Sequence, residues 1–143
     1  MSLRYLLDTS TVSAVIAKQP DARIVKRLEL HGHESAIAAP VLHELTYGCE
    51  RLEPGKRRTA IEAFLNDVLL RSFPVLPYDE AAALWHGQER ARLERSGKTA
   101  PFADGQIASV ARVHDLVLVT SNVKDFKRFR ELRIESWSSR AAG

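Results

Sequence analysis

The sequence contains one cysteine, Cys49, so no disulfide can form within the chain. It also lacks long apolar runs, and none approaches the ~20 residues that a membrane-spanning helix needs. The N-terminal segment does not match a signal peptide, because Asp8 interrupts its apolar run early. These absences predict a cytoplasmic protein without a membrane partner.

The composition is that of an ordinary globular domain. The chain has 143 residues, of which 45% are hydrophobic, and this length and apolar content suffice for one well-packed core. We expect a single domain over residues 1–137 and a short frayed tail over residues 138–143. The net charge of +3 is mildly basic, which permits a polyanionic partner without requiring one.

Short apolar segments alternate with amphipathic helical segments along the chain. The expected strands are 5–7, 35–38, 73–76, 116–120 and 133–137. The run at 116–120 is apolar throughout, which is typical of a parallel strand buried on both faces, whereas Pro74 suggests an edge strand or a strand start. A short basic helix is expected near 126–130. The pattern predicts an α/β fold: a three-layer α/β/α sandwich with a short, mostly parallel central sheet.

Four acidic residues fall where this fold places ligand-binding groups. Asp8 follows the first strand, and Asp125 follows the strand at 116–120. Ligands of open parallel sheets bind beyond the carboxyl ends of the strands. Glu44 lies one turn into the helix that begins at Pro40, beside an apolar stripe, and Asp104 shares a helical face with apolar residues.

Each acid alone also has an ordinary structural explanation. Asp8 and Asp125 are suitable helix caps, and Glu44 and Asp104 lie in first turns, where the helix dipole favours negative charge. If the four converge, however, two carboxylates 4 Å apart repel each other by roughly 4 kcal/mol at an effective dielectric near 20. Such a cluster must take up protons or bind a hard cation such as Mg²⁺.

Four segments in order, 7–10, 40–48, 103–108 and 118–126, resemble the PIN-domain ribonucleases, most closely the VapC and FitB type toxins of bacterial toxin–antitoxin pairs. The resemblance implies the PIN-type α/β/α fold and cleavage of RNA with Mg²⁺ or Mn²⁺. It also implies a homodimer and a cognate antitoxin that lies across the active groove.

The resemblance further implies roles for individual residues. The family's four acidic positions fall on Asp8, Glu44, Asp104 and Asp125. Asp8 and Asp104 are expected to bind the metal directly, and Glu44 and Asp125 directly or through water. The supporting residues are expected to be Ser10, Thr120 and Asn122.

Basic residues flank these acids in the sequence. The candidate RNA-binding residues are Arg90, Arg92, Arg95 and Lys98, before Asp104, and Lys124 and Lys127, around Asp125. They could neutralise RNA phosphates on both sides of the cut, although runs of surface lysine and arginine are often only solvated helix faces.

Two other classes of function stay open at this point. A Mg²⁺-dependent phosphotransfer domain also places an acid after its first strand, but the second acid expected two residues later is replaced by Ser10, and no phosphate-binding GxxxxGK[ST] loop is present. A non-catalytic module of the same fold, binding RNA or a partner, would be expected to lack one of the acids.

Overall fold

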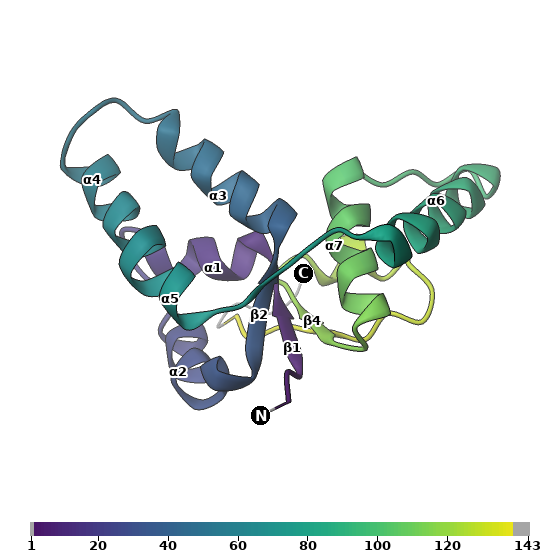
Figure 1. The fold of residues 1–143 in the computed structure, drawn as a ribbon, viewed down its shortest axis with the longest axis horizontal. Coiled ribbons are helices and arrows are strands. Elements are labelled where there is room, and N and C mark those ends of the chain that lie inside the picture. Colours follow the sequence, from purple (N-terminus) through teal and green to yellow (C-terminus); the bar gives the residue numbers. More distant parts are fainter. Residues whose placement is uncertain (1, 139–143) are drawn as a thin grey trace.

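The computed structural model describes residues 2–138, which form a parallel five-stranded sheet in the order β3-β2-β1-β4-β5 (Figure 1). The strands are β1 (Tyr5–Leu7), β2 (Ser35–Ala38), β3 (Val75–Leu76), β4 (Val117–Val119) and β5 (Ile134–Glu135). Every strand pair is parallel, as predicted. β3 follows Pro74 directly and lies at an edge, where the missing N–H of proline costs no ladder bond.

Helices cover both faces of the sheet, which confirms the three-layer sandwich. They are α1 (Thr9–Ile16), α2 (Ala22–His31), the 3-10 turn η1 (Gly32–Glu34), α3 (Ala39–Glu50), α4 (Lys56–Ala63), the π-helical η2 (Phe64–Leu69), α5 (Leu70–Ser72), α6 (Glu80–Arg95), α7 (Phe102–Val113) and α8 (Val123–Phe126). In Figure 1, α1 to α5 lie on one side of the central strands, and α6 and α7 lie on the other.

The helix expected near 126–130 was placed wrongly. α8 begins at Val123, because the backbone turns immediately after β4: Asp125 N donates to Asn122 O at 3.1 Å, and Lys127 N donates to Val123 O at 3.1 Å. Asp125 therefore lies inside the helix rather than in front of it. The following Phe129 is buried, so the chain bends back to the core in a turn.

The three central strands form the middle of the core. Leu7 pairs in register with Ile37 of β2 and with Val119 of β4, and all three side chains are fully buried. At the far end of the described chain, Trp137 is buried against the ring of Tyr5, with ring centroids 5.1 Å apart. Apart from Ser138, the predicted frayed tail lies outside the described residues. No helix within residues 2–138 has the length and apolarity to cross a membrane.

The order of the strands determines where the site lies. From β1 the chain proceeds outward to β2 and β3, and it then returns to the other side of β1 to add β4 and β5. β1 and β4 therefore flank the point where the direction of winding reverses, which is where open α/β sheets bind ligands. Asp8 and Thr120 follow these two strands directly.

α6 and α7 approach each other closely at Gly105. The buried His86 of α6 has Nδ1 2.8 Å from Tyr78 Oη, and its ring lies against the backbone of α7. A Cβ added at Gly105 would lie 2.1 Å from His86 Nε2. The close contact with His86 therefore requires glycine at position 105. The same contact positions the first turn of α7 against α6.

We therefore expect Gly105→Ala to lower the free energy of unfolding by about 1–3 kcal/mol, because His86 or α7 must move. In a His86→Ala background, the same substitution should cost almost nothing, since the colliding ring is gone. Urea unfolding of the four proteins measures this coupling. An equal cost of Gly105→Ala in both backgrounds would contradict it.

Candidate active site

Asp8 is held at the carboxyl end of β1 by two hydroxyl groups. Thr120 Oγ1 donates to Asp8 Oδ2 at 2.7 Å, and Ser10 Oγ donates to the same oxygen at 3.0 Å. Each hydroxyl oxygen in turn accepts a backbone N–H: Ser121 N lies 3.1 Å from Ser10 Oγ, and Asn122 N lies 3.0 Å from Thr120 Oγ1. The backbone after β4 thus orients both hydroxyls toward one oxygen of Asp8.

The other carboxylate oxygen of Asp8 has a different environment. Asp8 is 4% exposed, yet its Oδ1 accepts no hydrogen bond from residues 2–138. This oxygen is not one of the buried side-chain atoms without a partner, so it reaches solvent, where a ligand can approach it.

Glu44 is oriented by a threonine that the sequence analysis did not identify as a site residue. Thr9 Oγ1 donates to Glu44 Oε1 at 2.9 Å, which joins the first residue of α1 to the second turn of α3. Glu44 is half-buried, and its Oε2 accepts no hydrogen bond within the described part of the chain. Thr9 directly follows Asp8, and this adjacency was the only signal in the sequence.

Asp104 has the most perturbed environment among these acids. It lies in the first turn of α7, half-buried, and its pKa is raised to about 6, first by desolvation and then by the negative charges of Asp8, Glu44 and Asp125. All four predicted acids therefore lie near enough to interact electrostatically. The repulsion of Asp104 by the other three acids agrees with the sequence-based expectation that converging carboxylates oppose one another's ionisation.

Asp125 lies at the rim of this group. Its side chain is more than half exposed and lies 3.6 Å from the Arg128 guanidinium. Arg128 also lowers the pKa of Asp104, against the larger effects that raise it. Its Nε donates to Asp125 O at 2.7 Å and its Nη1 donates to Thr99 O, so backbone carbonyls fix the guanidinium in position.

The donor set suits a divalent cation that retains water ligands. Within residues 2–138, no three acidic, histidine or cysteine side chains lie close enough to hold a metal ion by themselves. Mg²⁺ does not require such a cage, because it usually keeps several waters and takes one or two carboxylates. The open oxygen of Asp8 and the repelled carboxylate of Asp104 fit that pattern.

The remaining predicted site residues have diverse surroundings. Asn122 is exposed and contributes its backbone N–H to Thr120. Lys98, Lys124 and Lys127 line a hollow of about 490 Å³ that also contains Asp125 and Arg128. Three arginines lie along α6 instead: Arg90 pairs with Glu94, Arg92 pairs with Glu89, and Arg95 has no ion-pair partner among the described residues.

The raised pKa of Asp104 predicts a pH-dependent stability of the metal-free protein. Between about pH 4 and 6 the folded state holds a proton on Asp104 that the unfolded state has released, so this group's contribution to stability falls as the pH rises. We expect Asp104→Asn to stabilise the protein by about 1–2 kcal/mol at pH 7.5 in EDTA. This value is reduced because Asp104 is partly exposed and solvent screens its charge. The gain in stability should disappear toward pH 4.

Thermal unfolding across this pH range measures the effect. Asp67→Asn is the matched control, because Asp67 is an exposed aspartate in η2. A gain in stability that is independent of pH, or one equal in both variants, would contradict the electrostatic origin.

Known proteins resemble this chain over nearly its whole length. The tRNA(fMet)-specific endonuclease VapC of Shigella flexneri is 37% identical over 95% of this chain and 99% of its own. Toxin FitB of Neisseria gonorrhoeae is 32% identical over 85% of this chain and 89% of its own. The structure of DNA-bound VapBC from Salmonella typhimurium includes a chain with a TM-score of 0.84 and 35% identity, covering 94% of this chain and 98% of that one. Residues 5–132 match the family model described as PIN domain, and the chain therefore belongs to the PIN-domain family.

Proposed function

We propose that this chain is a metal-dependent endoribonuclease that acts as the toxin of a type II toxin–antitoxin pair. The observation that carries the proposal is the position of Asp104, which is desolvated and repelled by three other carboxylates at the end of the sheet. Relatives that match the chain over almost their full length bear the names endonuclease, ribonuclease and toxin, which supports the same conclusion.

The side chains have distinct tasks in this proposal. Asp8 and Asp104 would hold a Mg²⁺ or Mn²⁺ ion directly, and Ser10 and Thr120 fix the orientation of Asp8. Glu44, positioned by Thr9, and Asp125 orient water molecules or accept protons from them. When bound, the ion lowers the pKa of an attacking water and stabilises charge on the scissile phosphate.

The basic hollow beside Asp125 is suited to the RNA backbone. Its cations, Lys98, Lys124, Lys127 and Arg128, can neutralise phosphates next to the cut, and the acids themselves cannot attract RNA without a cation. Two of the relatives are named tRNA(fMet)-specific endonucleases, so initiator tRNA is the first substrate to test.

We also propose that the chain forms a homodimer and is inhibited by a cognate antitoxin. Solved structures similar to this chain include FitAB bound to a DNA fragment and VapBC bound to DNA. These assemblies support a small protein partner for this chain. A non-catalytic binding module is disfavoured because all four acids are present and interact.

Asp8→Asn and Asp104→Asn should each reduce RNA cleavage by at least about 100-fold, because each removes a proposed ligand charge without a large change in volume. Asp67→Asn is the control and should leave the rate unchanged. Gel-resolved cleavage of initiator tRNA and of total RNA measures the rates, and growth arrest on expression provides a cellular readout. Full activity of either site variant would refute the site.

Removing divalent ions should stop cleavage, and adding Mg²⁺ or Mn²⁺ should restore it. The same ions should raise the melting temperature of the EDTA-treated wild type, because they bind only the folded cluster, and they should have little effect on Asp104→Asn. Cleavage that persists in excess EDTA would refute metal dependence while leaving the family assignment intact.

A further inference from the structure

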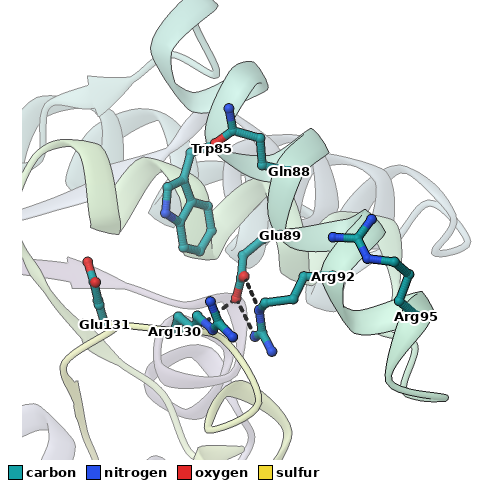
Figure 2. Close-up of a pocket in the computed structure, with 7 residues that line it drawn as sticks. All are labelled: Trp85, Gln88, Glu89, Arg92, Arg95, Arg130 and Glu131. Atoms are coloured by element: carbon teal, nitrogen blue, oxygen red, sulfur yellow. Dashed lines mark hydrogen bonds and ion pairs between the residues drawn. The ribbon is translucent and has the colours of Figure 1, made fainter.

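We propose that a second hollow, beside α6, binds single-stranded RNA next to the cut, holding one phosphate between two arginines and a base against Trp85. The proposal rests on the ribonuclease function argued above. The hollow has a volume of about 410 Å³. Figure 2 shows its walls: Trp85, Glu89, Arg92 and Arg95 from one side of α6, and Arg130 and Glu131 from the segment after α8.

A buried ion pair forms the floor of the hollow. Glu89 is 6% exposed and accepts from Arg92 Nε at 2.5 Å, from Arg92 Nη2 at 2.8 Å and from Arg130 N at 2.7 Å (Figure 2). Arg92 Nη2 also donates to Arg128 O at 3.0 Å. The negative charge of Glu89 is therefore neutralised, and the pair joins α6 rigidly to residues 128–130. The guanidinium of Arg92 is therefore occupied by this ion pair and is not expected to bind an RNA phosphate.

Two guanidinium groups of the hollow are not neutralised in this way. The side chains of Arg95 and Arg130 form no hydrogen bond or close ion pair within residues 2–138. The positive charge of Arg130 does contribute to lowering the pKa of Glu89. The second acid, Glu131, is already bonded to Arg112 at 2.6 Å. An excess of positive charge thus faces the hollow, and arginine forks bind phosphate oxygens well.

The aromatic wall indicates which anion fits. Trp85 is half-buried and packs against Phe129, with ring centroids 6.3 Å apart, so its indole is held in place while still lining the hollow. Proteins bind single-stranded nucleic acid with a combination of cationic groups and fixed aromatic surfaces on which bases stack. An acidic peptide would use the arginines but not the indole, so RNA is the better match.

The hollow also lies within reach of the proposed cut. Arg130 is five residues after Asp125, a separation that cannot exceed ~18 Å even in an extended chain. Arg128 lies between them in the sequence, with its carbonyl bonded to the floor of the hollow and its guanidinium next to Asp125. RNA bound at the acids could therefore continue past Arg128 into the hollow within a few nucleotides.

The test compares full-length proteins in a cleavage-deficient Asp104→Asn background. Arg95→Gln with Arg130→Gln should weaken binding of a labelled single-stranded RNA roughly tenfold or more, because charged hydrogen bonds to phosphate are removed. The slope of log K against log salt should fall by about 0.7 for each phosphate that the variant no longer neutralises. The matched control is Arg23→Gln with Arg71→Gln, two exposed arginines of the other helical layer, and it should alter neither quantity.

A second measurement tests the role of the indole. Trp137 is buried, so RNA should quench mainly the fluorescence of Trp85, and Trp85→Phe should remove that quenching. Inorganic phosphate alone should not reproduce it. In the cleavage-competent protein, the double arginine variant should raise KM for a long RNA and leave kcat unchanged.

The possible results separate this inference from the function on which it rests. If the wild type cleaves RNA while the double variant binds RNA with unchanged affinity and salt slope, the hollow is not an RNA site and the ribonuclease assignment survives. If the double variant instead changes the oligomeric state or antitoxin binding alone, the hollow is a protein contact and the inference is overturned. If the wild type neither binds nor cleaves RNA, the proposed function fails and the inference fails with it.

Discussion

Repulsion of Asp104 by three other carboxylates is the constraint on which the functional end of this protein depends. Asp104 is desolvated in the first turn of α7, and the charges of Asp8, Glu44 and Asp125 further oppose its ionisation, which raises its pKa to about 6. A fold that only needed stability would not gather these groups. Hydroxyl groups bond to Asp8 and Glu44, Arg128 lowers the pKa of Asp104, and a divalent cation could remove most of the remaining repulsion.

The topology of the sheet produces this convergence with little local strain. Because β1 lies between β2 and β4, the end of one central strand adjoins the segments that follow both neighbours. Thr120, after β4, can thus bond to Asp8, after β1, at 2.7 Å, while Thr9 joins Asp8's own segment to Glu44 on α3. The parallel ladder fixes these distances before any ligand is bound.

Sequence patterns predicted the sheet well because its strands are short apolar runs, and they singled out the four acids because each lies at a strand end or near the start of a helix. They failed where long-range contacts decide the structure. The backbone turns directly after β4, so α8 begins at Val123, and the buried Phe129 lies in the turn that follows it. The fit of His86 against Gly105 and the pairing of Glu89 with Arg130 N link segments far apart in the sequence. No local periodicity encodes such contacts, and surface charge runs of this kind appear in many helices.

Contacts between segments far apart in the sequence also fix the arginines that lie near the four acids. Arg128 bonds to the carbonyls of Asp125 and Thr99, and its guanidinium also forms an ion pair with the Asp125 carboxylate at 3.6 Å. Arg92 is likewise bound to Glu89, which fixes the backbone of residues 128–130. Since Arg128 is anchored by these carbonyls, its positive charge stays at the rim beside Asp125, while the charge of Arg92 is neutralised by Glu89.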